Sequence, residues 1–326
     1  MQIKNNYIYG AVLVAVILIS AFLYYSPFAA NAPLEGKENQ TDKIEWLVDK
    51  DGYLYYPLNR GDIRFNRANY SENDSIWVSK IIFPSKDNNV YGFLALPKSV
   101  SAEIPGIVYL PGAGVSKEAK LELAQQIAEL GAAVLVIDQR GIGETDGYFP
   151  TLDEDYDSFI NAKEPVQHLM VYDALRAYDV LYSAPFVDPN KIIIAGESLG
   201  GRIAIIAVSI DRNINGALAI SSAGFDFKDK GELNRDAFLK SIDSDHYIGL
   251  ISPRKLVMMH TLSDDIIPIA SAVNSFSKAQ EPKQFILVNE TECAHGYCDA
   301  MWNDLVEALD YLVEIKTQTI VSVPVE

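Results

Sequence analysis

Short apolar runs and amphipathic helical patterns alternate along most of the chain. Apolar runs of strand length include Ile107–Leu110, Ala133–Ile137 and Ile192–Ala195. Strands without polar alternation are typical of parallel sheets that are covered on both faces. Between these runs, segments such as Lys117–Leu130 carry apolar residues at helical spacing. The alternation predicts an α/β sandwich with a mostly parallel central sheet and helices on both faces.

The same rhythm extends over most of the chain. Ile76–Phe83 and Val90–Leu96 are β-rich runs separated by Lys-Asp-Asn-Asn, which predicts a hairpin before the alternation begins. Residues 222–253 are polar and charge-rich, and they predict a small insertion at the C-terminal edge of the sheet. The other predicted elements are Val166–Leu181, Leu199–Val208, Ala217–Ile220, Leu256–Met259, Ile269–Ala279, Phe285–Val288 and Asp299–Ile315.

Composition divides the chain into four segments. Residues 1–30 are mostly apolar, and residues 31–74 form a polar linker and an N-terminal extension. Residues 75–316 hold the predicted α/β domain, and residues 317–326 form a short tail.

The N-terminal segment has the length and polarity of a membrane span. Ile8–Tyr25 is almost wholly apolar, and this length suffices to cross a hydrocarbon core of about 30 Å. Two readings stay open, namely a retained transmembrane anchor and a signal peptide cleaved near Ala30-Asn31-Ala32. Lys4 before the span favours an N-terminus inside the cell. The α/β domain is then expected outside the cytoplasm, tethered to the membrane or secreted.

Charge and cysteine content exclude several classes of protein. The chain has 27 Lys+Arg and 44 Asp+Glu and a net charge of −17, which argues against nucleic acid as a partner. Its hydrophobic fraction of 49% excludes a mainly disordered chain. Two cysteines are too few for a disulfide-built scaffold or a four-cysteine zinc module.

A candidate nucleophile follows one of the predicted strands. The run Ile192-Ile-Ile-Ala-Gly196-Glu-Ser198-Leu-Gly200 is a strand that passes through Gly-x-Ser-x-Gly into a helix. Such a turn holds its serine in a strained conformation, and side chains two residues to either side would collide with neighbouring elements. The glycines therefore point to a nucleophilic serine.

With this motif in its context of strand and helix, the chain resembles the α/β-hydrolase superfamily over about residues 75–316. Val171-Tyr-Asp-Ala-Leu-Arg-Ala and Phe186-Val-Asp-Pro-Asn-Lys, which precede the serine motif, are similar to the prolyl-oligopeptidase, dienelactone-hydrolase and acetyl-xylan-esterase branch. The resemblance implies a triad in the order Ser, acid, His. His295 alone satisfies this order, because His168 precedes the serine and both His246 and His260 precede the acid.

The acid follows the strand that begins at Leu256. The run from His260 to Pro268 is similar to the family pattern His-Gly-x-x-Asp-x-x-x-Pro, with Thr261 in place of the glycine. Its register selects Asp264, and Asp265 is the alternative.

The roles of these residues follow from the movement of the proton. Ser198 is a poor nucleophile until His295 removes its proton, and Asp264 fixes and stabilises the imidazole. The oxyanion needs two N–H donors. The family pattern implies the backbone of Leu199 and, after Ile107–Leu110, the backbone of Ala113, with Gly112 as the alternative.

Three weaker signals point to other chemistry. Gly141-Ile-Gly143 lacks the directly adjoining strand and helix that a dinucleotide fingerprint needs. The acidic residues at 153–157 could suggest a calcium loop, but they are interpreted as a solvated acidic loop. Cys293, His295 and Cys298 have the residue types of a zinc site, but the triad needs that histidine. The two cysteines are either a disulfide that clamps the histidine loop or two packed thiols. No metal and no cofactor are expected.

The resulting prediction is a serine hydrolase that cleaves carboxylic esters through an acyl-enzyme. A prolyl-oligopeptidase-type peptidase and a non-catalytic binding protein on the same fold are the alternatives. The expected partner is a small-molecule ester or peptide substrate, and the sequence leaves the oligomeric state open.

Overall fold

The computed structural model describes residues 45–99, 103–289 and 293–315. Contacts divide the chain between Gln40 and Thr41, and all described residues fall in the second unit. The predicted anchor at residues 8–25 and the tail at residues 317–326 lie outside the described residues. Within the described ranges, no helix is long and apolar enough to cross a membrane.

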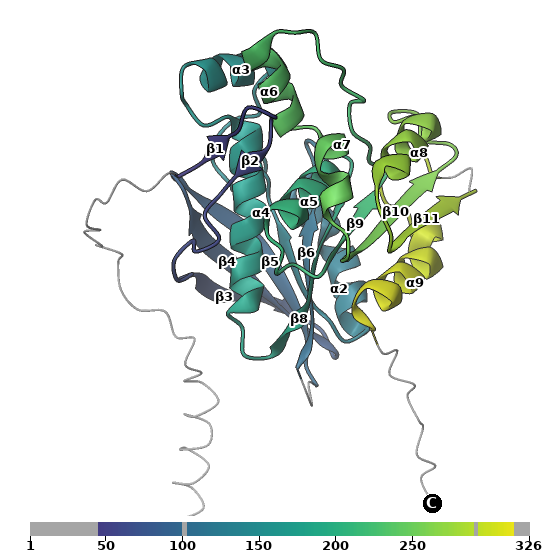
Figure 1. Ribbon diagram of the computed structural model, residues 1–326. Helices are drawn as coiled ribbons and strands as arrows, with labels where there is room; N and C mark the ends of the chain where they lie inside the picture. Colours follow the sequence, from purple (N-terminus) through teal and green to yellow (C-terminus); the bar gives the residue numbers. More distant parts are fainter. Residues whose placement is uncertain (1–44, 100–102, 290–292, 316–326) are drawn as a thin grey trace, which may run out of the picture. The chain divides into compact units, whose positions relative to one another are not determined.

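A nine-stranded sheet forms the centre of the described unit, in the order β11-β10-β9-β8-β6-β7-β5-β4-β3 (Figure 1). From β11 to β7 neighbouring strands are parallel, whereas β5, β4 and β3 pair antiparallel. The strands are β3 Asn66–Glu72, β4 Ile76–Ser85, β5 Asn88–Pro97, β6 Ile104–Leu110, β7 Ala133–Ile137, β8 Val187–Glu197, β9 Gly216–Ile220, β10 Lys255–Thr261 and β11 Lys283–Val288. A separate ribbon joins β1 Leu47–Val48 to β2 Leu54–Tyr55.

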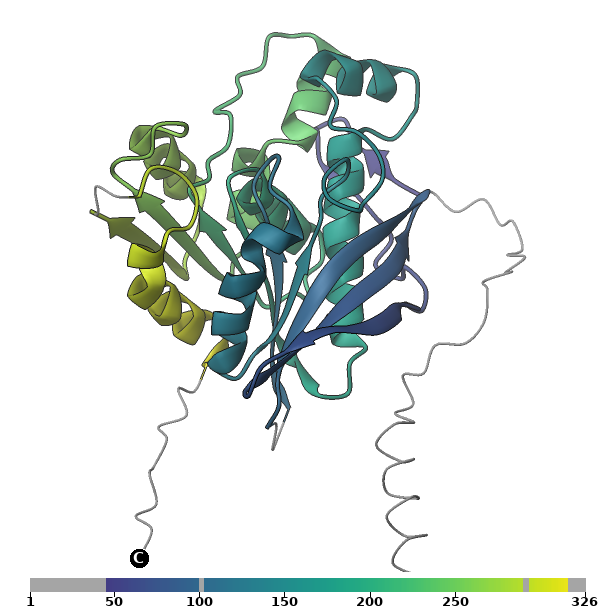
Figure 2. The same cartoon turned by 180° about the vertical axis from the view of Figure 1, so that it is seen from behind.

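Helices cover both faces of this sheet. One face carries α4 Val166–Tyr182, α5 Leu199–Ile210, α7 Ser244–Tyr247 and α8 Ile269–Lys278 (Figure 1). The other face carries α2 Leu121–Glu129 and α9 Trp302–Val313 (Figure 2). Short 3-10 turns are η1 Lys117–Lys120, η2 Ile248–Leu250 and η3 Asp299–Met301. The predicted sandwich with a mostly parallel sheet is confirmed, and so is the β4–β5 hairpin, in which Ser85 pairs with Asn88.

The acidic segment at residues 153–157 is not a loop, contrary to the prediction. It belongs to helix α3, Leu152–Ile160. Thr151 and Glu154 form a capping box, which satisfies two backbone N–H groups at the start of the helix. Asp153, Glu154 and Asp155 lie in its first turn, where negative charge is favourable.

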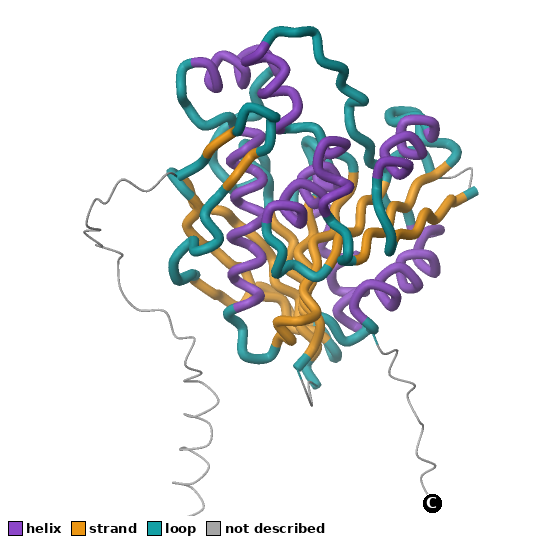
Figure 3. The backbone as a smooth tube through the Cα atoms, viewed as in Figure 1, coloured by secondary structure: helices purple, strands orange, loops and turns teal. Residues whose placement is uncertain are grey.

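Helix α6, Leu233–Ser241, lies within the charge-rich segment at residues 222–253 and packs against α3. The guanidinium of Arg235 on α6 lies 3.1 Å from the carboxylate of Asp153 on α3. Both helices lie beyond the carboxyl ends of the parallel strands, among the loops at the upper edge of Figure 3.

A buried cation joins the N-terminal extension to this unit. The Arg60 guanidinium lies 2.7 Å from Asp179 on α4 and 2.7 Å from Asp211, which follows α5. The side chains of Arg60 and Asp211 are buried. This interaction ties the extension to the two helices that flank strand β8.

We expect Arg60→Met to lower the free energy of unfolding by about 3–5 kcal/mol, because Asp211 would keep a buried charge without its cation. Urea unfolding measures the change. As a control, Lys191→Met removes the surface pair with Glu314 and is expected to cost less than about 1 kcal/mol. Equal losses in the two variants would contradict the proposed role of Arg60.

Candidate active site

Ser198 lies at the turn between β8 and α5 in a strained conformation. Its φ is 53° and its ψ is −119°, values that few residues other than glycine adopt. Hydrogen bonds on both sides hold it there. The Ser198 N–H donates to the carbonyl of Ile220 at 2.9 Å, and the Ser222 hydroxyl donates to the carbonyl of Ser198 at 2.8 Å.

The glycines of the motif allow the turn to pack directly against backbone. A Cβ on Gly196 would lie 2.5 Å from the carbonyl oxygen of Gly200, and one on Gly200 would lie 2.0 Å from that of Leu110. Both distances are far below van der Waals contact. The start of α5 therefore packs against the end of β6 at a separation that excludes any side chain.

This approach also places the segment 111–114 beside the serine. A Cβ on Gly112 would lie 3.4 Å from the Cβ of Ser198. The side-chain amide of Gln139 donates a hydrogen bond to the carbonyl of Pro111 and so anchors the start of this segment. The two expected oxyanion donors, Leu199 and Ala113, thus belong to segments that meet at Ser198.

Asp264 lies in the loop after β10, and its side chain is 0% exposed. Its Oδ1 accepts hydrogen bonds from the N–H groups of Ile266 and Ile267, at 3.0 and 2.8 Å. Burial acts to raise the pKa of this carboxyl. The N–H of Ile267 and the imidazole of His295 outweigh burial, so the pKa lies below its usual value. The neighbouring Asp265 is exposed.

His295 lies after β11 and pairs with this carboxylate. Its Nδ1 is 2.9 Å from each of the two oxygens of Asp264, and its side chain is 18% exposed. An ionised carboxylate can only accept hydrogen bonds, so in this arrangement Nδ1 carries the proton. With the proton on Nδ1, the lone pair of Nε2 is free to act as a base.

The other three histidines have different principal partners, although His260 also borders the carboxylate of Asp264. Nε2 of the buried His260 lies 2.9 Å from the carbonyl oxygen of Ile267 and 3.6 Å from Asp264, and burial lowers the pKa of His260. His168 lies in the core against the Ser241 hydroxyl, and burial lowers its pKa to about 3. His246 stacks on the ring of Tyr53 with 3.9 Å between ring centroids.

Cys293 and Cys298 form a disulfide that closes a short loop around His295. Their Cα atoms are 5.7 Å apart, which lies within the usual range for a disulfide. The Thr261 hydroxyl donates to the carbonyl of Cys293 at 3.1 Å and ties the loop to β10. The sequence left open whether the thiols pair. The bond occupies both sulfurs, so they are not available as zinc ligands.

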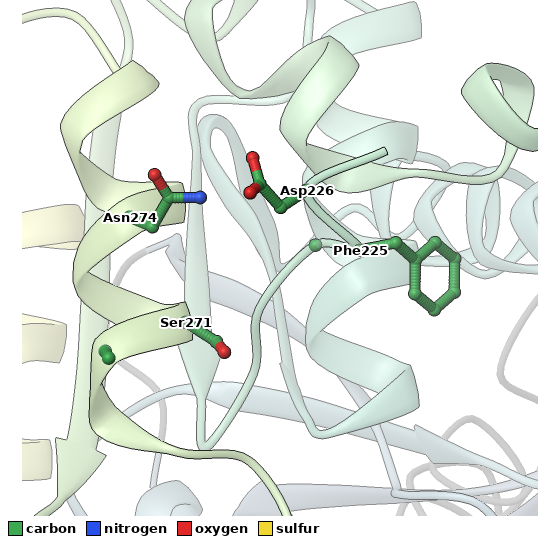
Figure 4. Close-up of a pocket in the computed structure, with 6 residues that line it drawn as sticks. Phe225, Asp226, Ser271 and Asn274 are labelled. Carbon is green, nitrogen blue, oxygen red and sulfur yellow. The ribbon is translucent and has the colours of Figure 1, made fainter. Parts of the chain in front are cut away.

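A pocket lies between the segment after β9 and helix α8 (Figure 4). The side chains of Asp226 and Asn274 face one another across it, whereas the ring of Phe225 points away. Lys278 lowers the pKa of Asp226. The lining residues are Gly224, Phe225, Asp226, Ala270, Ser271 and Asn274, and none of the expected site residues is among them.

Sequence reasoning missed four side chains that support the site. Ser222 and Gln139 fix the serine turn and the segment 111–114, as described above. Glu197 and Lys120 form an ion pair next to the histidine loop. Glu197 left a signal, because it is a charged residue at the end of an apolar strand.

The mostly parallel sheet with helices on both faces is an α/β-hydrolase fold. Ser198 after β8, Asp264 after β10 and His295 after β11 follow the chain order typical of that fold. The sequence profile of the acetyl xylan esterase (AXE1) family matches residues 60–239. The chain therefore belongs to the acetyl xylan esterase family, and it is a hydrolase of the carboxylesterase type.

Individual proteins are similar to this chain in structure or in sequence. The acetyl xylan esterase from Paenibacillus sp. R4 superposes with a TM-score of 0.65 and 19% identity, over 77% of this chain and 88% of that chain. A cold-adapted esterase from an Arctic intertidal metagenomic library superposes with a TM-score of 0.57 and 16% identity, over 77% and 99%. The uncharacterized protein YfhR of Escherichia coli O157:H7 is 24% identical over 79% of this chain and 89% of that protein.

We expect protein purified without reductant from an oxidising compartment to contain the Cys293–Cys298 bridge. Its mass should be lower by two hydrogen atoms, and its cysteines should resist alkylation until reduced. Replacing both cysteines with alanine should lower the free energy of unfolding by about 2 kcal/mol for so short a ring. Two freely alkylated thiols in the unreduced sample would contradict the bridge.

Proposed function

We propose that the protein is a serine esterase that cleaves carboxylic esters through an acyl-enzyme, with Ser198, Asp264 and His295 as the catalytic triad. The observation that carries the proposal is the pairing of His295 Nδ1 with both oxygens of the buried Asp264, at 2.9 Å. A second support is the strained, glycine-flanked turn at Ser198.

In this mechanism His295 Nε2 takes the proton of Ser198 while the serine Oγ attacks the ester carbonyl carbon. The backbone N–H groups of Leu199 and Ala113 stabilise the tetrahedral oxyanion. His295 then returns the proton to the departing alcohol, and an acyl-serine remains. Water, deprotonated by His295, attacks this acyl group and releases the acid and the free serine.

The proposed substrates are short-chain acyl esters, and acetyl esters of carbohydrates above all. Family membership supports the acetyl group. The segment at 222–253 adds a second argument, because helix α6 is polar and charged rather than a long apolar lid.

We also propose that the enzyme acts outside the cytoplasm, anchored by residues 8–25 or secreted if that segment is cleaved. The apolar length of residues 8–25 supports this location. The Cys293–Cys298 bond supports it too, because disulfides persist in oxidising compartments.

Substitutions in the triad test the mechanism. We expect Ser198→Ala to abolish hydrolysis and His295→Ala to lose a comparable factor, since the two residues act as one unit. Asp264→Asn should lower kcat by about 10⁴-fold, because the imidazole would adopt the wrong tautomer. The matched control is Asp265→Asn, in which an exposed carboxylate changes and kcat should stay within about twofold. A larger loss in Asp265→Asn than in Asp264→Asn would assign the acid to Asp265.

A substrate panel tests the reaction class. A fluorophosphonate probe should label the wild type and leave Ser198→Ala unlabelled. Nitrophenyl acetate and butyrate should be cleaved faster than long-chain esters, and acetylated xylo-oligosaccharides should be deacetylated. Faster cleavage of prolyl amides than of any ester would indicate a peptidase instead. A folded protein that neither reacts with the probe nor turns over any substrate would indicate a binding protein.

A further inference from the structure

Glu197 is a charged side chain that the proposed mechanism does not use. It directly precedes Ser198, at the end of the apolar strand β8, and is only 3% exposed. The hydrogen bonds that hold Ser198 in the turn come from backbone groups and from the Ser222 hydroxyl, and the Glu197 carboxylate makes its contacts elsewhere. A buried carboxylate is costly unless it is paired and hydrogen-bonded, which raises the question of what it holds.

The carboxylate of Glu197 reaches the loop that carries His295. Its Oε2 accepts a hydrogen bond from the backbone N–H of Tyr297 at 2.8 Å. Gly296 lies against the same oxygen, because a Cβ there would be 2.8 Å from Oε2. The two residues that follow His295 therefore rest on the side chain that precedes Ser198.

Lys120 fixes the other end of this carboxylate. Its ammonium lies 2.6 Å from Oε1 of Glu197, and both side chains are largely buried. Lys120 ends the turn η1, which follows the segment 111–114 along the chain. The Glu197 side chain thus connects strand β8 to η1 through the ion pair and to the histidine loop through the hydrogen bond from Tyr297.

We propose that Glu197, held by Lys120, is a positioning residue of the hydrolytic reaction that acts through His295. It sets the place of the loop Cys293–Cys298, and so the reach of the His295 imidazole toward Ser198. The inference rests on the proposed triad and adds to it a residue outside the triad. A misplacement of about 1 Å in a catalytic group can cost about 100-fold in rate, so one hydrogen bond to the loop is enough to matter.

Kinetics of graded variants test this role, with nitrophenyl acetate as the substrate. Glu197→Leu removes the acceptor and the charge, and we expect kcat to fall about 100-fold with KM unchanged within about twofold. Glu197→Gln keeps an acceptor for the Tyr297 N–H but loses the ion pair, so a smaller fall of about 10-fold is expected. Lys120→Met should resemble Glu197→Gln. These last two variants carry the test if Glu197→Leu does not fold.

A matched control separates positioning from general stability. Glu164 and Lys86 form another largely buried pair, 3.2 Å apart, and Glu164 also accepts a hydrogen bond from the Tyr56 hydroxyl. Glu164→Gln should lower the melting temperature about as much as Glu197→Gln and leave kcat unchanged. An equal fall of kcat in both variants would overturn the positioning role.

Coupling to His295 is the decisive measurement. In a His295→Ala background, Glu197→Leu should cause no further loss of the residual rate, because the residue through which it acts is absent. The same 100-fold loss in both backgrounds would overturn the inference. A folded Glu197→Leu variant with wild-type kcat would overturn the inference too. If His295→Ala had low activity in the same experiment, the proposed triad would still stand. Wild-type activity in His295→Ala would overturn both the triad and the inference.

Discussion

The contact between the start of α5 and the end of β6 is the constraint on which the site depends. At Gly200 this contact is so close that a Cβ would overlap the carbonyl of Leu110. The turn at this contact holds Ser198 at a positive φ, which is a strained conformation. Strain of this kind persists only where the surroundings hold it. Here the buried sheet, the Ile220 carbonyl and the Ser222 hydroxyl do so. The same contact brings the segment 111–114 beside the serine, so one packing requirement positions both the proposed nucleophile and the expected oxyanion donors.

Buried carboxylates then connect the loops at the carboxyl edge of the sheet. Asp264 accepts hydrogen bonds from two backbone N–H groups and pairs with an imidazole. Glu197 accepts a hydrogen bond from one backbone N–H and forms an ion pair with an ammonium. Each would be costly to bury alone. Their partners compensate that cost, and the same contacts hold the loops in the observed arrangement. The disulfide closes the histidine loop on itself, and the Thr261 hydroxyl, Glu197 and Asp264 hold the loop to its surroundings.

The sequence predicted the features that depend on local pattern or on chain order. Apolar runs located β6, β7 and β8, and the glycines located the turn at Ser198. The family resemblance selected His295 by chain order and Asp264 by the register of its motif, and the structure brings these two side chains within hydrogen-bond distance. Helix α3 was missed because its acidic residues read as solvated, whereas the capping box at Thr151 makes the same charges favourable. The contact between Glu197 and Tyr297 joins residues 100 positions apart, and no periodicity reports such a pair.

The acidic surface bears on which esters can reach such a site. A net charge of −17 repels anions at low ionic strength, and salt screens that repulsion beyond about 10 Å at 0.1 M. An uncharged acetyl ester is not subject to it, so the acid excess does not slow the encounter with the proposed substrates. Within the candidate site, hydrogen bonds hold the pKa of Asp264 below its usual value, and in the proposed mechanism this carboxylate faces an imidazole that becomes cationic. Negative charge on the protein disfavours anionic substrates, and in the proposed mechanism the carboxylate of Asp264 favours the imidazolium that forms after Ser198 loses its proton.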